Sequence, residues 1–356
     1  MSRIIVEEIR GIDALDVLSD EWKMLFKMAS NVSPFLSWEW IVTWQRWLSY
    51  GRIPCIFCAR SGNNLVGLLP LGEEEYCLSV LRIRVRRLFL LGKGDYFDIL
   101  ALPGWELDVA SAIFDYLAQH VAFDLLELDN MAADSLSLPL LAQRFNVENV
   151  FRYRVMPRFV CPQVKFESGE EDVLKNSRRA RNFKQRLRRL QKHDGFEYRS
   201  ITHPNEVGDA FERFLELHEA RWANDGGSEL TGHPVLQEFH REAVRRLAHA
   251  GLLRFDELWV EGVCIASFYG MDDGQNYYLY NSGYHPAWKM VSPGFVLLGL
   301  SLENAARRGI KCYDFLRGVT KHKLDWANSE RRTVCVQVSS RRPLTQGNVK
   351  VQRYQK

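Results

Sequence analysis

Side chains that could take part in chemistry are concentrated between Tyr313 and Trp326. The segment reads Tyr-Asp-Phe-Leu-Arg-Gly-Val-Thr-Lys-His-Lys-Leu-Asp-Trp, so an apolar, strand-like run ends in an acid, an arginine, a glycine and two lysines. This pattern is typical of a buried parallel strand that opens at the edge of a sheet, where ligands bind. Asp314 is the candidate general base, and Arg317, Lys321 and Lys323 are candidate anion-binding groups.

Asp314 has a competing structural interpretation. A base that works near neutral pH must hold a proton readily, whereas the three nearby cations stabilise the charged carboxylate and make it a weaker base. An ion pair with Arg317 or a lysine would use the same residues without any catalytic role.

Two histidines and two tyrosines are further candidates. His218 has a side chain whose ordinary pKa suits proton transfer near neutral pH, but it lies on the apolar face of an expected helix over residues 204–222. A hydrogen-bonded core histidine is therefore as compatible with the sequence as a catalytic one, and the same holds for His240 on the next helix. Tyr278 and Tyr280 share one face of an expected strand, where packing is the simpler use.

Arginine side chains next to aromatic residues or glycine are candidate anion binders. Arg221 precedes Trp222 at the end of an expected helix, and Arg317 precedes Gly318 at the end of an expected strand. A guanidinium held at such an end can bind a carboxylate or phosphate through two hydrogen bonds.

The elements that must position these residues occur in the same order twice. A hairpin, a strand, a helix and a strand are expected over residues 53–128, and again over residues 252–315. Element order, rather than sequence identity, indicates a duplication. In this superposition Glu127 occupies the position of Asp314, but the first copy lacks the arginine, glycine and lysines that follow, so the second copy is the expected active one.

The turn Ser292-Pro293-Gly294 introduces the helix of the second copy. The order of glycine turn, helix, strand and charged loop is often used to hold phosphorylated ligands. Pro293 cannot donate a backbone hydrogen bond, which weakens the expected phosphate site in this turn.

A basic helix is expected over residues 177–193. The net charge of the chain is only +3, yet eight cations and no acid lie between Arg178 and Lys192. Apolar residues recur there at helical spacing, which predicts an amphipathic helix with a broad cationic face. A solvated face is the simplest interpretation, followed by an anion site and then by a nucleic-acid surface, because Phe183 is the only aromatic residue in the stretch.

The cysteines, the possible metal ligands and the hydropathy of the sequence limit the classes of protein to which the chain can belong. The seven cysteines are scattered, and Cys55 and Cys58 would point to opposite faces of a strand, so we expect reduced thiols rather than a disulfide framework. His218-Glu219 lacks the second histidine of a zinc-binding helix, and we expect no metal. The longest apolar-rich run, residues 290–302, is too short to span a bilayer, so we expect a cytoplasmic protein without a membrane span.

Several of these motifs together resemble one family. They are Leu217-His218-x-x-Arg221-Trp222, Phe239-His240, Ile265-Ala266, Ser292-Pro293-Gly294, Asp314-Phe-Leu-Arg317-Gly318 with Lys323 and Trp326, and, in the first half, Pro34-Phe35 with Trp38 and Trp40, and Gly67-Leu-Leu-Pro70-Leu71. Over roughly residues 20–335 the chain resembles the acetyltransferases named for cellulose biosynthesis (CelD/BcsL type), and it is distantly similar to the FemAB peptidyltransferases.

The resemblance implies an α/β fold made of two GNAT (acyl-CoA N-acyltransferase) copies, with two mixed sheets flanked by helices. It implies an N-terminal lobe over residues 1–160 without a donor site, a catalytic lobe over residues 161–340 that includes the basic helix, and a flexible tail over residues 341–356. The activity implied is transfer of an acetyl or other acyl group from acyl-CoA to an amine or hydroxyl of a sugar, nucleotide-sugar or other small acceptor.

For an acyltransferase, the candidate residues would have the following roles. The candidate catalytic residues are Asp314, His218 and Tyr280, of which Tyr280 would protonate the departing thiolate. The candidate CoA-binding residues are Ser292, Gly294, Arg317, Lys321 and Lys323, and the candidate acceptor-binding residues are Arg221, Trp222, His240 and Tyr278. Two alternatives stay open: a FemAB-like aminoacyltransferase that uses aminoacyl-tRNA, which is the less favoured partner, and a non-catalytic binding or assembly module in polysaccharide biosynthesis.

Overall fold

The structure is a computed structural model, and it describes residues 3–29, 33–78, 83–146, 150–166, 178–223 and 225–340. The expected tail over residues 341–356 and the first residue of the expected basic helix, Ser177, lie outside these ranges. The chain divides into two units, one made of Met1–Gln45, Ser49–Phe159 and Arg332–Lys356, the other of Arg46–Leu48 and Val160–Arg331.

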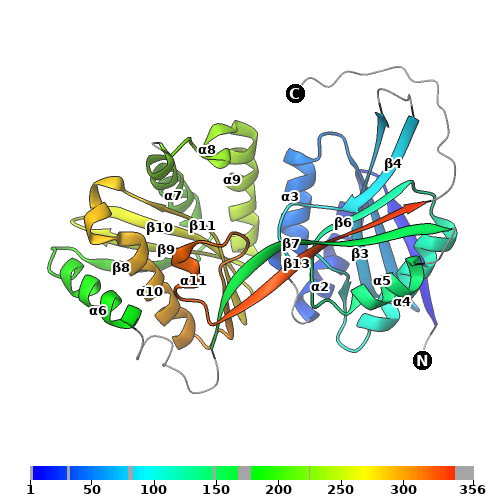
Figure 1. Cartoon of the computed structure of the whole chain (residues 1–356). Coiled ribbons are helices and arrows are strands. Elements are labelled where there is room, and N and C mark those ends of the chain that lie inside the picture. The colour runs from blue at the N-terminus through cyan, green and yellow to red at the C-terminus, as the bar shows by residue number, and fades with distance from the viewer. Residues whose placement is uncertain are drawn as a thin grey trace. The chain divides into compact units, whose positions relative to one another are not determined.

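The first unit has a hairpin-rich half-sheet with helices before and after it (Figure 1). Its elements are β1 (Ile4–Arg10), α1 (Ala14–Val17), α2 (Ser19–Met28), η1 (Pro34–Leu36), α3 (Trp38–Leu48), β2 (Ile53–Ser61), β3 (Asn64–Leu78), β4 (Ile83–Leu90), β5 (Leu100–Ala101), α4 (Glu106–His120), β6 (Leu125–Ala132) and α5 (Ser137–Phe145). The chain then leaves this unit along β7 (Phe151–Lys165) and returns to it along β13 (Ser329–Ser340).

The second unit repeats the order of the first. Its elements are α6 (Arg178–Leu190), β8 (Glu197–Ile201), α7 (Val207–Trp222), α8 (Glu229–Gly232), α9 (Pro234–His249), β9 (Leu253–Val260), β10 (Val263–Asp272), β11 (Asn276–Tyr284), η3 (Pro286–Val291), α10 (Pro293–Arg307), β12 (Cys312–Asp314) and α11 (Lys321–Leu324). The predicted order of hairpin, strand, helix and strand is confirmed in both units: β2-β3-β4-α4-β6, with the short β5 inserted, and β9-β10-β11-α10-β12.

The prediction of two separate sheets is wrong. The strands form one 13-stranded mixed sheet in the order β1-β2-β3-β4-β6-β13-β7-β12-β11-β10-β9-β8, and β5 pairs with β3. The reason is β7, to which sequence reasoning assigned no strand, because Pro157, Pro162 and several arginines interrupt its apolar pattern. β7 and β13 are neighbours in this order, and they join the two series of strands.

The second unit has helices on both faces of its strands. α6 and α10 cover one face, where Phe183, Leu190 and Val296 belong to a buried cluster with Leu258 and Tyr313. α7 and α9 cover the other face, where aromatic rings pack against one another, among them Phe211, Phe214, Phe255 and Tyr269. Figure 1 shows these two pairs of helices on opposite sides of the strands. Burial on both faces makes β10 an almost continuous apolar strand.

Within the described ranges, none of the helices combines the length and hydrophobicity that a transmembrane segment needs. The seven cysteines are free, and Cys55 and Cys58 are both buried in β2. No group of three or more His, Cys, Asp or Glu residues that could hold a metal ion occurs among the described residues.

Candidate functional site

The parallel pairing of β11 with β12 stops at Asp314. Asn276, Tyr277 and Tyr278 pair with Cys312, Tyr313 and Asp314, after which β12 ends while β11 continues to Tyr284. Residues 279–284 therefore have no partner in β12. Backbone groups on this edge of β11 are the kind of donors and acceptors that a ligand can engage at a sheet edge.

β11 also contains a bulge at the point where it parts from β12. Tyr269 of β10 pairs with Asn281 and Gly270 pairs with Leu279, so Tyr280 is an extra residue on β11. A bulge turns backbone groups away from the regular ladder and is common next to active sites. The bulge and the end of β12 together mark this end of β11 as the candidate site.

The Asp314 carboxylate shapes the turn that follows β12. Asp314 is 1% exposed, and its oxygens accept hydrogen bonds from the backbone N–H of Leu316 at 2.6 Å and from the Gln163 side-chain amide at 2.6 Å. Leu316 has a φ of 54°, a left-handed conformation that is uncommon for a residue other than glycine. The two hydrogen bonds help to hold this turn in place.

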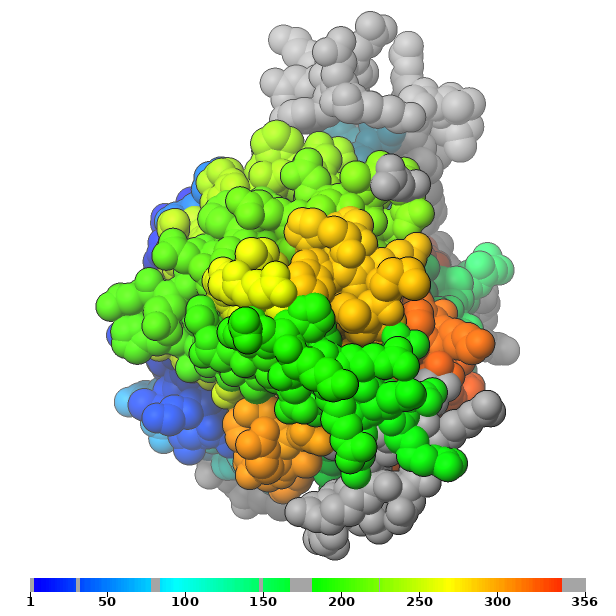
Figure 2. All heavy atoms as spheres, turned by 90° about the vertical axis from the view of Figure 1, so that its left-hand side faces the viewer, coloured from blue at the N-terminus to red at the C-terminus, as the bar shows by residue number. Residues whose placement is uncertain are grey.

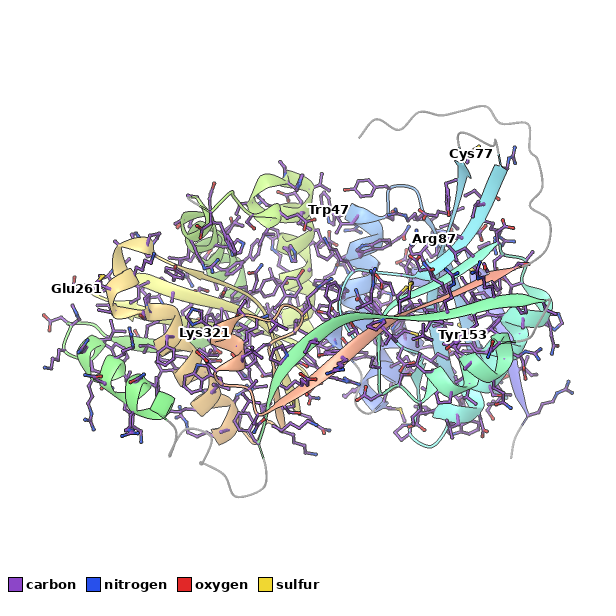
Figure 3. All side chains as sticks on the ribbon, in the orientation of Figure 1. Trp47, Cys77, Arg87, Tyr153, Glu261 and Lys321 are labelled. Atoms are coloured by element: carbon purple, nitrogen blue, oxygen red, sulfur yellow. The ribbon has the colours of Figure 1, made fainter. Side chains whose placement is uncertain are left out.

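Lys323 closes the same turn from the other side. Its ammonium donates hydrogen bonds to the carbonyl oxygens of Phe315 at 2.8 Å and Arg317 at 2.9 Å. Lys321 begins α11 and is exposed (Figure 3). The sequence-predicted Asp314, Arg317 and Lys323 therefore lie together. The contacts described for Lys323 are with the turn itself, whereas Asp314 contacts both the turn and Gln163 of β7.

His218 is buried and has a hydrogen bond at each ring nitrogen. Nδ1 lies 2.8 Å from the carbonyl oxygen of Ser282 in β11, and Nε2 lies 2.7 Å from Oγ of Ser228. Burial lowers the pKa of His218 below its ordinary value, the bond to Ser282 opposes this, and the charge of Arg221 lowers it further. The ring is therefore neutral near pH 7, and the carbonyl fixes the tautomer: Nδ1–H donates to Ser282, and the Ser228 hydroxyl donates to Nε2.

A glycine brings His218 to this strand. A Cβ at position 283 would lie 2.6 Å from the backbone nitrogen of His218 and 2.8 Å from the carbonyl carbon of Leu217, so Gly283 lets α7 rest directly on β11. One turn further along α7, the Arg221 guanidinium lies 4.1 Å from the Trp222 ring centroid and 5.6 Å from that of Tyr284. The last turn of α7 thus lies against the part of β11 that has no partner in β12.

The remaining predicted residues, His240, Tyr280 and Tyr278, contact other polar groups. His240 lies on α9 with Nδ1 3.4 Å from the Tyr269 hydroxyl and Nε2 3.5 Å from the Tyr280 hydroxyl, and the rings of His240 and Tyr280 are 5.4 Å apart. Tyr278 is buried, and its hydroxyl lies 3.4 Å from Oδ2 of Asp273. Burial raises the pKa of Tyr278 well above its usual range.

The predicted phosphate turn lies at the start of α10, beside α6. Ser292 precedes α10 in a left-handed conformation with a φ of 56°, and its carbonyl accepts the backbone N–H groups of Phe295 and Val296. The Arg186 guanidinium of α6 donates to the Ser292 hydroxyl and lies 5.7 Å from the Phe295 ring centroid. One cation of the basic helix is therefore placed where Pro293 offers no backbone donor.

The first unit has a differentiated counterpart of this arrangement. β4 and β6 pair in parallel, and the pairing ends at Phe89 and Glu127, as it does at Tyr278 and Asp314 in the second unit. Arg87, labelled in Figure 3, contacts Glu127, and Gln337 donates to Glu127 at 2.8 Å. Glu127 therefore occupies the predicted position but is engaged by an arginine and an amide.

Three residues that contribute here were not singled out from the sequence. Gln163 lies on β7, which was not predicted, so nothing in the sequence pointed to it. Ser228 caps α8 by accepting the N–H of Leu230 at 3.2 Å, and a serine before a short helix is a recognisable cap signal. Arg186 was one of eight cations, and its contact with Ser292 depends on the packing of α6 against α10.

Comparison with protein families gives one match. Residues 177–324 match a protein family described as acetyltransferase (GNAT) domain. This part of the chain is similar to GNAT domains. The match covers the second unit from α6 to α11, and a domain of this kind indicates an acyltransferase. Sequence comparison with curated proteins found no match.

Solved structures show the same fold over both units. The crystal structure of FemX has a TM-score of 0.64 at 10% identity and covers 89% of this chain and 95% of its own. The C-terminal domain of a putative lysylphosphatidylglycerol synthetase from Agrobacterium fabrum has a TM-score of 0.58 at 11% identity, covering 90% and 92%. The structure of L-PGS from Bacillus licheniformis has a TM-score of 0.55 at 9% identity, covering 89% and 90%. At these identities the likeness concerns the fold.

Proposed function

We propose that the chain is an acyltransferase whose donor site lies in the second unit, at the end of β11 that has no partner in β12. It would move an acetyl or other acyl group from acyl-CoA to an amine or hydroxyl of a sugar, nucleotide-sugar or other small acceptor, as in the CelD/BcsL type and in polysaccharide biosynthesis. The observation that carries the proposal is the end of the β11–β12 pairing at Asp314, inside the segment that matches the GNAT family.

In this proposal the acyl donor is held by groups on both sides of residues 279–284, the part of β11 that has no partner in β12. Ser292, Gly294 and Arg186 would bind the phosphates at the start of α10, with Arg317, Lys321 and Lys323 as further cations beyond β12. Backbone N–H groups near the Tyr280 bulge would donate to the carbonyl oxygen as negative charge develops on it. Tyr280, with its hydroxyl near His240, would protonate the departing thiolate.

The acceptor would be bound by the last turn of α7, where Arg221 and Trp222 lie against Tyr284, with His240 and Tyr278 as the further residues implied for it. Its proton can pass through the half-buried Ser228 hydroxyl to Nε2 of His218, which is neutral and already accepts from that hydroxyl. Asp314 acts in this scheme by holding the turn after β12 rather than by taking a proton. Attack on the thioester is direct, so catalysis depends on orientation.

Two rivals follow from the same fold. A FemAB-like enzyme would use an aminoacyl group carried by tRNA, and the fold likeness to FemX favours testing that donor. A non-catalytic module would keep the fold for binding, which the proline in the phosphate turn makes reasonable.

A thermal-shift panel separates the three. The full chain is mixed in turn with acetyl-CoA, longer acyl-CoAs and charged tRNA, and release of free CoA thiol is then followed with candidate acceptors. A rise in Tm with acyl-CoA, followed by acceptor-dependent thiol release, supports the proposal. A response to charged tRNA alone supports the first rival, and no response to any donor supports the second.

A further inference from the structure

α6 presents a stripe of exposed cations to solvent. Phe183 and Leu190 are fully buried against α10 and the sheet, whereas the cations on the opposite side of the helix and in the following turn are exposed. At about 100° per residue these cations share one side, over a length of about 12 Å from Arg181 to Arg189. They are Arg181, Lys184, Arg188, Arg189 and Lys192.

Within the described part of the chain, these cations take part in no ion pair. Among residues 178–340 that the structure describes, no carboxylate forms a salt bridge with any of the five, and Glu303 is the acid whose charge is felt near Lys184. Close to the end of the stripe, Glu261 pairs with His193 instead, at 3.1 Å. The described residues therefore give this stripe a net positive charge, and its attraction is strongest for a partner that offers many negative charges at once.

An exposed apolar side chain lies at the edge of the stripe. η3 packs against α6, and two contacts lie at its ends: the Trp288 ring is 5.3 Å from the ring of His193, in the turn after α6, and the hydroxyl of Ser292, the residue after η3, accepts from Arg186. Lys289 and Met290 lie between these two anchor points, and Met290 is 89% exposed. Figure 2 shows α6 in bright green and the segment around η3 in gold on the same face of the chain.

The composition of this face distinguishes between polyanions. Single-stranded nucleic acid is usually held by several aromatic side chains on which successive bases stack. Phe183 of the basic helix is buried, and the Trp288 ring beside the stripe is half-buried against His193. A small anion would engage only part of a stripe this long. A row of cations with a flexible, exposed apolar side chain beside it is instead the combination by which proteins bind anionic membrane surfaces without crossing them.

We propose that the cationic face, defined as Arg181, Lys184, Arg188, Arg189, Lys192 and Lys289 together with Met290, docks on an anionic phospholipid bilayer. The charges lie in the headgroup field, and Met290 enters the interface between headgroups and acyl chains. The start of α10 lies directly beside this face, so docking brings the proposed donor site to acceptors anchored in the membrane. The inference rests on the surface itself and holds whichever acyl donor the chain uses.

Vesicle co-sedimentation of the full chain tests the inference. We expect binding to equimolar phosphatidylcholine–phosphatidylglycerol vesicles at low salt, loss of binding at high salt, and none to pure phosphatidylcholine. One cation near an anionic surface contributes about fivefold in partitioning, so Arg188→Glu/Arg189→Glu should lower it by at least about tenfold. Met290→Ala should lower it several-fold at unchanged Tm, because apolar area is lost from the interface.

A matched control changes the net charge equally at another place. Arg152→Glu/Arg154→Glu, on exposed positions of β7, should leave vesicle binding within about twofold of the unaltered chain. Equal losses in the two double variants would overturn the inference, as would binding to single-stranded oligouridylate without binding to vesicles, or no binding to vesicles at all. Because Arg188→Glu/Arg189→Glu leaves Arg186 in place, it should retain the acetyl-CoA thermal shift, which separates a failure of this inference from a failure of the proposed function.

Discussion

At the scale of single residues, His218 shows how a candidate catalytic group is tied into the fold. Its two ring nitrogens join three segments: α7, which carries it, β11 through Ser282, and the start of α8 through Ser228. A histidine buried in this way is both a structural link and a neutral proton acceptor. Its protonation at low pH would put a charge inside the fold.

The pH dependence of stability should reveal the buried neutral state of His218. Because its pKa is lowered on folding, the unfolded chain binds the proton more readily, and the folded chain loses stability as pH falls below the ordinary histidine value of about 6.5. His218→Gln removes this titration. We expect urea unfolding to show a smaller loss of stability between about pH 7 and pH 5 in the variant than in the unaltered chain. Equal losses would show that His218 is not buried as a neutral group.

Substitutions of Asp314 distinguish a structural role in the turn after β12 from a role as general base. Asp314→Ala leaves the Leu316 N–H and the Gln163 amide without this acceptor, so we expect the free energy of unfolding to fall by about 2–4 kcal/mol. Asp194→Ala, an exposed acid in the same unit, should change it by less than about 0.5 kcal/mol.

The conservative variant Asp314→Asn separates the two roles in turnover. It keeps an acceptor for Leu316 but cannot act as a general base, so in the present scheme it should retain most of the acyl-transfer rate. A loss of several orders of magnitude, with the fold intact by circular dichroism, would make Asp314 the base.

At the scale of elements, the contact between α7 and β11 places the candidate site. Gly283→Ala would force a Cβ against the backbone of Leu217 and His218, which cannot move as a flexible side chain would. We expect a loss of about 1–3 kcal/mol in the free energy of unfolding, together with a higher KM, because the last turn of α7 is displaced.

Gly208 provides the control for that substitution. It lies in the first turn of α7, and an added Cβ there has no atom within 4 Å. Gly208→Ala should therefore stabilise the chain, by up to about 1 kcal/mol. Similar stability changes for the two variants in denaturant unfolding would contradict the close approach at Gly283.

Several elements could be predicted from the sequence because their signals are local. The cationic stripe with buried Phe183 and Leu190 predicts α6, and the Glu261-Gly262 turn predicts the β9–β10 hairpin. β7 was not predicted because Pro157, Pro162 and several arginines interrupt its apolar pattern, and Gln163 was missed with it. The hydrogen bond between Ser228 and His218 depends on the path of the chain after α7, which no local pattern encodes.

At the scale of the whole molecule, each unit is completed by a strand from a distant part of the sequence. β13 pairs with β6 from Thr333 to Ser339, and β7 pairs with β12 through Gln163, Val164 and Lys165. The order of elements along the sequence therefore predicts the repeat. It does not predict that the strands of both copies join in one sheet.

A chain that ends at Glu330 tests whether the first unit depends on β13. It lacks nearly all of β13, including the fully buried Val336 and Val338, so β6 loses the hydrogen-bond partner on one of its edges. Hydrogen exchange followed by mass spectrometry should show protection lost in β6, by at least about tenfold in rate. Unchanged protection of β6 would mean that β13 does not contribute to the first unit.

The most direct test of the account is calorimetric titration of the full chain with acetyl-CoA, compared between Arg186→Ala and Arg245→Ala. Arg186 adjoins the start of α10, whereas Arg245 is an exposed arginine on α9, across the sheet from α6. We predict saturable binding to one site, weakened about tenfold or more by Arg186→Ala, because a charge-assisted hydrogen bond is lost, and unchanged by Arg245→Ala. Absence of binding, or equal affinity in the two variants, would contradict a donor site at the start of α10.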